Sequence, residues 1–212
     1  MKIRTFNNNS MGQNTYLYYD EKSGESVIID AGCSEADIRA IAVFLGENNI
    51  AVKGILLTHG HYDHIIAAAE LKNLTGAAVC SHQLETQMLE NPSVNLSTRI
   101  GIDLAVVPEK LFNDGDVFEF GGAALNVLHT PGHTIGGVCY YDSENGNLFT
   151  GDTLFRQSVG RTDLPMGSHQ ELVANISNKI FSMPDNTNVY PGHGPETTIG
   201  YEKTHNPFVK LL

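Results

Sequence analysis

The sequence predicts an α/β protein in which two β-sheets pack face to face, with helices on the outside, in a four-layer arrangement. Short apolar or β-rich runs occur in both halves of the chain, which is typical of strands in more than one sheet. Amphipathic helical segments lie between those runs, and each needs a sheet face to cover. Hydrophobic residues make up 41% of the chain, which is enough for packed cores. Periodicity alone leaves open a three-layer, doubly wound fold.

In the first half of the chain, strands and helices alternate. Apolar and β-rich runs predict strands at residues 15–19, 27–30, 52–58 and 79–80. Ser34 followed by Asp37 has the spacing of a helix start, and apolar residues at helical intervals continue from there to a stop near Gly46. Further helices are predicted over residues 65–76 and 82–90.

The second half consists mainly of short strands separated by turn residues. We predict strands at residues 117–120, 124–128, 138–141, 148–150 and 188–190. Ser168 with Glu171 forms a capping box, and the apolar residues from Leu172 to Ile180 keep helical spacing. Because no repeat, linker or low-complexity tract interrupts the pattern, we expect a single domain over residues 1–212.

The composition excludes several classes of protein. The 13 Lys and Arg against 24 Asp and Glu give a formal net charge of −11, which argues against binding to the phosphate backbone of nucleic acids. No run approaches the ~20 apolar residues that cross a bilayer, and the polar start MKIRTFNNNS does not read as a signal peptide. The 3 isolated cysteines suggest no disulfide framework. We therefore expect a cytoplasmic protein that binds neither nucleic acid nor membrane.

A dense cluster of candidate metal ligands follows the strand predicted at residues 52–58. The run THGHYDH contains His59, His61, Asp63 and His64 at the junction of an apolar strand and an amphipathic helix. Imidazole nitrogens and carboxylate oxygens suit Zn²⁺, Fe or Mn. In an extended stretch His59 and His61 point to the same side and can share one ion, whereas Asp63 and His64 begin the helix and can serve a second.

Three more polar residues stand after apolar strands and next to glycines. These are His133 in TPGH, Asp152 in TGD and His193 in PGH. Glycine beside each ligand allows the backbone to approach a metal or a substrate closely. Each motif is weak alone, but together with the THGHYDH cluster they predict a metal site. The remaining histidines are expected to be structural or exposed: 82, 129, 169 and 205.

Together these motifs resemble the metallo-β-lactamase superfamily and, within it, the glyoxalase II-like (hydroxyacylglutathione hydrolase-like) branch, over nearly the whole chain. The resemblance implies an αββα sandwich of the metallo-β-lactamase type that binds two divalent metal ions, with Zn expected and Fe or Mn as alternatives. It implies two groups of ligands and a bridge between them: His59, His61 and His133; Asp63, His64 and His193; and Asp152 as the bridge. Asp30, in VIIDAG at the end of a strand, is expected to orient a ligand histidine from behind.

The resemblance implies a hydrolase that cleaves a thioester by attack of a metal-bridging hydroxide, with Asp63 and Asp152 as its catalytic carboxylates. A thiolate can leave without a proton donor, which is compatible with the absence of an obvious general acid. Arg161 matches the basic residue that holds the carboxylate of the thiol in glyoxalase II, although an ion pair with Asp163 is an equal alternative. We expect a small, anionic acyl-thiol as substrate.

Several positions depart from full-length glyoxalase II. Asp163 and Pro195 stand where that enzyme has aromatic residues, and we expect no counterpart of its helical C-terminal substrate domain. The chain is therefore most similar to short, single-domain bacterial hydrolases of this branch. Common zinc β-lactamases are disfavoured because they lack a bridging carboxylate like Asp152.

Two other functions stay open. The GRTD run at residues 160–163 also resembles persulfide dioxygenases, in which a single iron would use His59, His133 and Asp152. A metal-binding module without catalysis is the third class. Oxygen consumption with a persulfide, together with intact thioesters, would identify the dioxygenase.

Overall fold

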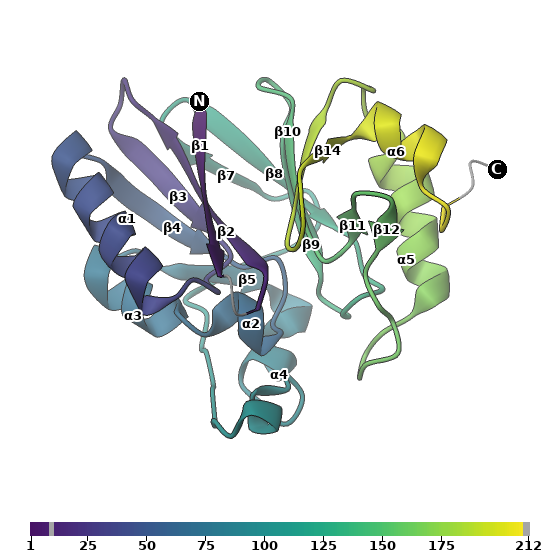
Figure 1. The fold of residues 1–212 in the computed structure, drawn as a ribbon, viewed down its shortest axis with the longest axis horizontal. Helices are drawn as coiled ribbons and strands as arrows, with labels where there is room; N and C mark the ends of the chain where they lie inside the picture. Colours follow the sequence, from purple (N-terminus) through teal and green to yellow (C-terminus); the bar gives the residue numbers. More distant parts are fainter. Residues whose placement is uncertain (9–10, 210–212) are drawn as a thin grey trace.

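The computed structural model describes residues 1–8 and 11–209, and it confirms the expected four layers (Figure 1). Over that part of the chain, two six-stranded sheets face each other. Helices lie on the two outer sides: α1 (Glu35–Asn48) and α3 (Ala68–Thr75) on the first sheet, α5 (His169–Asn175) and α6 (Ile199–His205) on the second.

The strands of the first sheet follow the chain in simple order, and the sheet changes from antiparallel to parallel at β3. Its strands are β1 (Lys2–Asn8), β2 (Gln13–Asp20), β3 (Glu25–Ile29), β4 (Ala51–Leu56), β5 (Val79–His82) and β6 (Lys110–Phe112). Strands β1 to β3 pair antiparallel, whereas β3 to β6 pair parallel. Because parallel pairs need crossovers, the helical segments of this half of the chain fall between β3 and β6.

The second sheet has the order β14-β13-β10-β9-β8-β7. Its strands are β7 (Val117–Phe120), β8 (Ala123–His129), β9 (Val138–Asp142), β10 (Asn147–Gly151), β13 (Asn188–Pro191) and β14 (Thr197–Thr198). A separate small ribbon pairs β11 (Leu154–Phe155) with β12 (Ser158–Val159). The parallel pairing of β10 with β13 brings the turns after both strands to the same end of the sheet.

Alternation along the strands divides the buried apolar side chains between the layers. In β3, Val27 and Ile29 point into the space between the sheets, and Ile28 points outward to the helices. In β10, Phe149 lies between the sheets and Leu148 packs against the helices of the opposite outer side. Both faces of the sheets are therefore buried at β3 and β10, which is why these two strands read as continuous apolar runs.

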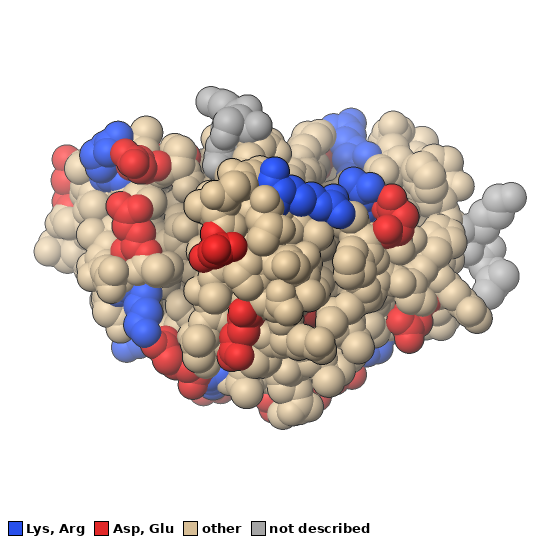
Figure 2. Space-filling model, turned by 90° about the horizontal axis from the view of Figure 1, so that it is seen from below, with Lys and Arg blue, Asp and Glu red and all other residues tan. Residues whose placement is uncertain are grey.

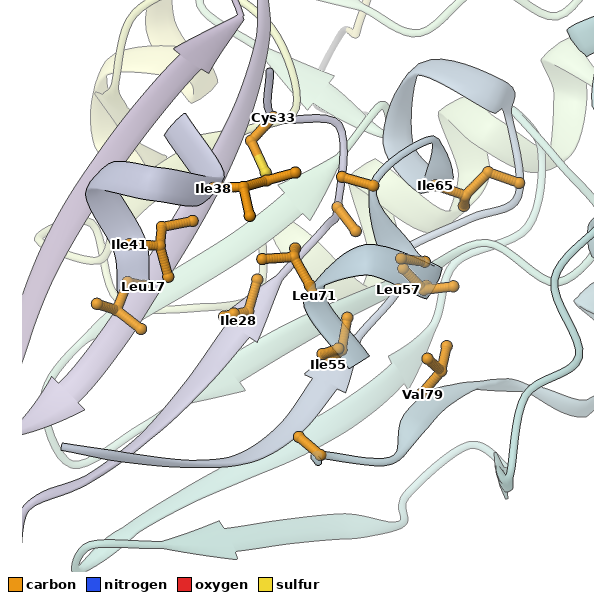
Figure 3. Close-up of a cluster of buried hydrophobic side chains, with 14 of the residues drawn as sticks. Leu17, Ile28, Cys33, Ile38, Ile41, Ile55, Leu57, Ile65, Leu71 and Val79 are labelled. Atoms are coloured by element: carbon orange, nitrogen blue, oxygen red, sulfur yellow. The ribbon is translucent and has the colours of Figure 1, made fainter. Parts of the chain in front are cut away.

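The outer cluster of the first sheet joins α1 and α3 to the strands (Figure 3). Ile28 lies in this cluster with Ile41 of α1 and Leu71 of α3, and all three are fully buried. Burying a side chain of this size stabilises the fold by about 1.5–3 kcal/mol relative to leaving it exposed. Helical periodicity in the sequence thus corresponds to contacts with one face of this sheet.

The start of α1 is confirmed, and the helix ends two residues after the predicted stop near Gly46. Ser34 and Asp37 form the expected capping box. The helix continues past Gly46, because Asn49 adopts a left-handed conformation with φ of 52° and its N–H bonds back to the Gly46 carbonyl.

The single helix predicted over residues 65–76 is in fact two. Helix α2 (Tyr62–Ile65) is one turn long, and α3 begins only at Ala68. Ala31, which follows β3, accounts for the break because its N–H bonds to the His64 carbonyl at 2.7 Å and its carbonyl accepts the Ala67 N–H at 2.8 Å. Bonds to a strand end thus replace helical bonds. The predicted end at Gly76 is confirmed.

Several other elements differ from the prediction. The helix predicted over residues 82–90 consists of a 3₁₀ turn, η1 (Gln83–Glu85), followed by the short α4 (Thr86–Leu89). The π-helical turn η3 (Ile176–Ile180) prolongs α5. Sequence patterns missed β1, β6, β11, β12, β14, α6 and the 3₁₀ turn η2 (Ser97–Ile100). No helix in the described residues is long and apolar enough to cross a membrane.

A buried histidine at the start of η1 makes stability depend on pH. His82 accepts the Leu84 N–H at Nδ1 and stacks on His129 with ring centroids 4.2 Å apart. Burial, and then the nearby His129, lower the pKa of His82 to about 4. The fold therefore favours neutral His82, so its stabilising contribution is complete above pH ~6.5 and is lost as the pH falls towards 4.

We expect His82→Asn to make unfolding less sensitive to acid than it is in the wild type. Asparagine keeps an acceptor for the Leu84 N–H but cannot be protonated in this range. The measurement is the free energy of urea unfolding of metal-free protein between pH 7 and 4.5. Equal losses of stability in the two proteins over this range would show that His82 stays neutral in both states or charges without cost.

Candidate metal centre

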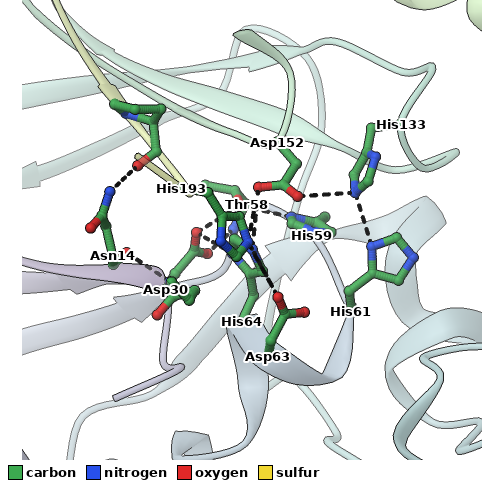
Figure 4. A network of polar contacts seen from close by, with 12 residues as sticks. Asn14, Asp30, Thr58, His59, His61, Asp63, His64, His133, Asp152 and His193 are labelled. Atoms are coloured by element: carbon green, nitrogen blue, oxygen red, sulfur yellow. Dashed lines mark hydrogen bonds and ion pairs between the residues drawn. The ribbon is translucent and has the colours of Figure 1, made fainter. Parts of the chain in front are cut away.

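The seven predicted ligands converge at one end of the facing sheets (Figure 4). His59 and His61 come after β4, His133 after β8, Asp152 after β10 and His193 after β13, while Asp63 and His64 lie in α2. Strand ends from both sheets therefore deliver the donors to one place. Potential ligand atoms in each of three overlapping triplets lie within 4.8 Å of one another: His59, His61 and His133; His59, His64 and Asp152; Asp63, His64 and His193.

The first triplet is a group of buried imidazoles. His61 Nδ1 lies 2.9 Å from His133 Nε2, and the rings of His59 and His133 meet edge to face. Two acceptor-capable nitrogens this close must share a proton or a cation. The Nε2 atoms of His59 and His61 are buried and have no hydrogen-bond partner among the described residues.

The triplet of Asp63, His64 and His193 combines two imidazoles with a carboxylate. His64 Nε2 lies 3.2 Å from His193 Nε2, and His193 Nε2 lies 3.2 Å from Asp63 Oδ2. His64 is fully buried, whereas His193 and Asp63 are partly exposed. This side of the cluster is therefore the one that is open to solvent.

Asp152 stands between the three-histidine group (His59, His61 and His133) and the group of Asp63, His64 and His193. Its Oδ1 is 3.3 Å from His64 Nε2, and its Oδ2 is 3.5 Å from His133 Nε2. Burial opposes ionisation of Asp152, yet the nearby charge and hydrogen bond of His64 hold its pKa well below the usual range. One ionised carboxylate thus presents a separate oxygen to each group, which is the arrangement of a bridging ligand.

These residues fit divalent cations. Burial, and then charge on neighbouring imidazoles, lower the pKa of His61 to about 3 and that of His59 well below its usual range. Neutral imidazoles with unpaired nitrogens, beside ionised carboxylates, form a nitrogen and oxygen donor set suited to Zn²⁺, Fe or Mn. Without a cation the unpaired buried nitrogens would lose hydrogen bonds that they make in water.

Asp30 contacts the predicted ligand His64 on the side that faces away from the cluster. Its Oδ2 lies 2.8 Å from His64 Nδ1, and its carboxylate also accepts the backbone N–H and the hydroxyl of Thr58 at 2.8 and 2.9 Å. Because a carboxylate only accepts, His64 carries a proton on Nδ1, and a cation bound in the cluster would take the place of the proton on Nε2. The anchoring role of Thr58 carried no signal in the sequence.

A backbone carbonyl does the same for His133. The Arg161 carbonyl lies 2.7 Å from His133 Nδ1, which keeps the proton there and leaves Nε2 facing Asp152. A Cβ on Gly160 would collide with the Asp152 carbonyl, so glycine is required for this approach. The sequence predicts a role for the Arg161 side chain but carries no signal for its carbonyl.

The Arg161 side chain is paired with Asp163, which is one of the two alternatives that the sequence left open. Its guanidinium makes two hydrogen bonds of 2.8 Å to the carboxylate of Asp163, and both side chains are more than half exposed. An exposed pair of this kind contributes little to stability because solvent screens it, so a substrate carboxylate could replace Asp163 at small cost. In the structure Arg161 thus forms an ion pair with Asp163, and its contact with a substrate stays a prediction.

Charge on the face seen in Figure 2 is mixed. Acidic and basic side chains are scattered among neutral ones there, and basic side chains gather in one short band. The net charge of −11 therefore does not form one continuous acidic field over this face.

Comparisons with known proteins agree with this geometry. Residues 9–193 match the family model described as the metallo-beta-lactamase superfamily. The hydroxyacylglutathione hydrolase GloC of Haemophilus influenzae is 34% identical, over 93% of this chain and 92% of the relative. The solved structure of the BLEG-1 B3 metallo-beta-lactamase superposes with a TM-score of 0.90 at 38% identity, over 99% of this chain and all of that one. A protein solved in a di-iron-bound form, TTHA1623, gives 0.83 at 34% identity over the same shares.

Proposed function

The chain belongs to the metallo-β-lactamase superfamily and is a metal-dependent hydrolase, and from that premise we propose that it cleaves the thioester of a small acyl-thiol with two divalent cations bound. The observation that carries the proposal is the position of Asp152, with one oxygen towards each group of histidines. A bridging carboxylate implies that both groups are filled. The similarity to a hydroxyacylglutathione hydrolase supports the choice of a thioester.

We assign one cation to His59, His61 and His133, and the other to Asp63, His64 and His193, with Asp152 between them. Zinc suits this donor set, and iron or manganese are the alternatives, since a structural relative holds two irons. Two cations, when bound, would lower the pKa of a water towards ~7 and polarise the substrate carbonyl.

The carboxylates orient the attacking water. Asp63 faces His193 at the open side of the cluster, and Asp152 lies deeper, so a water between them meets an acceptor on each side. Burial raises the pKa of Asp63, but the charge of His64 and a hydrogen bond from His193 more than offset it, so the net pKa is lowered and Asp63 is an acceptor at neutral pH. Each can hold a proton from the water at Oδ while the carbonyl is attacked.

The leaving group and the thiol carrier define the substrate class. A thiolate whose parent thiol has a pKa near ~8.5 leaves without a proton, so the cluster needs no further acid. We propose that Arg161 binds a carboxylate of the substrate by exchanging it for Asp163, which favours an anionic acyl-thiol. A cytoplasmic location and a single domain over residues 1–212 remain predictions.

Metal analysis combined with a thiol-release assay tests this function. We expect two cations per chain, and release of thiol from an anionic thioester that stops on chelation and returns with Zn²⁺. A matched neutral thioester should show a higher KM, because it cannot bind Arg161. If a chromogenic cephalosporin is cleaved faster than the thioesters, the protein is a β-lactamase. If it consumes oxygen with a persulfide and leaves thioesters intact, it is a dioxygenase.

A further inference from the structure

A buried carboxylate joins the loop that carries His59 and His61 to the loop that carries His133. Glu85, at the end of η1, is fully buried, and its two oxygens accept different backbone N–H groups. Oε1 accepts from Gly60 at 2.9 Å, and Oε2 accepts from Gly136 at 2.7 Å. Gly60 lies between His59 and His61, and Gly136 belongs to the loop that begins at His133.

The close contact with this segment leaves no room for a side chain at Gly60 or Gly136. A Cβ on Gly136 would collide with the backbone and the carboxylate of Glu85. A Cβ on Gly60 would lie 3.0 Å from Met88 and 3.2 Å from Leu89, which belong to α4 immediately after Glu85. The loops can therefore approach the segment from η1 to α4 only because neither carries a side chain at the contact.

We propose that Glu85 is a positioning residue that fixes His59 and His61 relative to His133 and so sets the affinity of this group for its cation. The inference rests on the proposed binding of two cations. Glu85 bonds to backbone groups beside these histidines and lies next to the Thr134 side chain, which follows His133, so it acts through the loops and not on a cation directly. The other group is supported separately, because Asp30 holds His64, and it should not respond to a change at position 85.

Glu85→Gln is the sharpest variant. A carboxylate offers an acceptor at both oxygens, whereas an amide offers one oxygen and one N–H₂ donor, which would face the N–H of Gly60 or Gly136. One of the two loops must then move away. Replacing a residue that orients a metal ligand typically lowers metal affinity by about 10- to 100-fold, and we expect a loss of that size at one cation only.

Glu202→Gln is the matched control. Glu202 in α6 is also fully buried, and it accepts the Gln157 N–H at 2.8 Å and the Thr197 hydroxyl at 2.6 Å. It bonds to none of the proposed ligands. Its replacement should lower the thermal stability of metal-free protein as Glu85→Gln does, without a selective effect on either cation.

The experiment is competition for Co²⁺ or Zn²⁺ between each protein and a chelator, with the visible spectrum of the Co²⁺ forms recorded. We expect wild type and Glu202→Gln to bind two cations alike, and Glu85→Gln to bind one normally and one about 10- to 100-fold more weakly, with an altered Co²⁺ spectrum. If Glu85→Gln does not fold, Glu85→Asp, which keeps the charge but shortens its reach, should show the same selective loss to a smaller extent.

Two outcomes would overturn the inference in different ways. A wild type that binds no cation would contradict the proposed function and this inference with it. A wild type that binds two, together with a Glu85 variant that binds both as tightly or weakens both as Glu202→Gln does, would contradict this inference alone.

Discussion

Asp152→Asn should leave a folded protein that retains at most one cation per chain and hydrolyses thioesters about 10²- to 10⁴-fold more slowly. The carboxylate now presents one oxygen 3.3 Å from His64 Nε2 and the other 3.5 Å from His133 Nε2. An amide has a single oxygen, so it can serve one group, and its N–H₂ repels a cation at the other. It also removes one of the two carboxylates that orient the water.

The measurement is the metal content after dialysis, together with kcat on the best thioester. Asp142→Asn is the control, because Asp142 is a fully buried carboxylate that accepts the Tyr18 hydroxyl at 2.6 Å but bonds to no proposed ligand. It should lower the free energy of unfolding and keep both cations. Two tightly held cations and a near wild-type rate in Asp152→Asn would remove Asp152 from the bridging role.

The ligand cluster could be predicted because its signals are local. Each candidate is a charged or imidazole side chain placed directly after an apolar run, as with Asp152 after the strand that contains Phe149. Strand ends at the same edge of a sheet bring such residues together without further information. The layer order was harder, because buried strands in a three-layer and a four-layer fold have the same apolar pattern.

The parts that could not be predicted are held by backbone groups. The carbonyl of Arg161 and the N–H of Gly136 have no counterpart in residue type, and Glu85 stands in a segment for which the sequence predicted only a helix. The break between α2 and α3 likewise depends on two backbone bonds to Ala31. Edge strands such as β1 were missed because only one of their long sides is paired and their sequences are mixed.

Asp30→Asn tests the support of the second group. Asp30 is buried, and its carboxylate accepts from Thr58 twice and from His64 Nδ1. Asparagine has nearly the same shape and tolerates the left-handed backbone of this residue, where φ is 57°. With its oxygen bonded to the Thr58 N–H, its N–H₂ must face His64 Nδ1. The imidazole then accepts at Nδ1 and carries its proton on Nε2, which faces the cluster.

A protonated Nε2 cannot bind a cation, so we expect Asp30→Asn to weaken the cation held by Asp63, His64 and His193 by about 10- to 100-fold. The three-histidine group should lose less affinity, because Asp30 reaches it only through the Thr58 hydroxyl, which lies 3.1 Å from His59 Nδ1. This is the reverse of the pattern expected for Glu85→Gln. Asp30→Ala would leave buried donors unpaired and cost about 1–3 kcal/mol for each, so it should destabilise the fold more than asparagine does. Chelator competition and urea unfolding separate the two effects. If Asp30→Asn weakened both cations equally, the two groups would be held as one rigid unit and Asp30 would not act through the tautomer of His64.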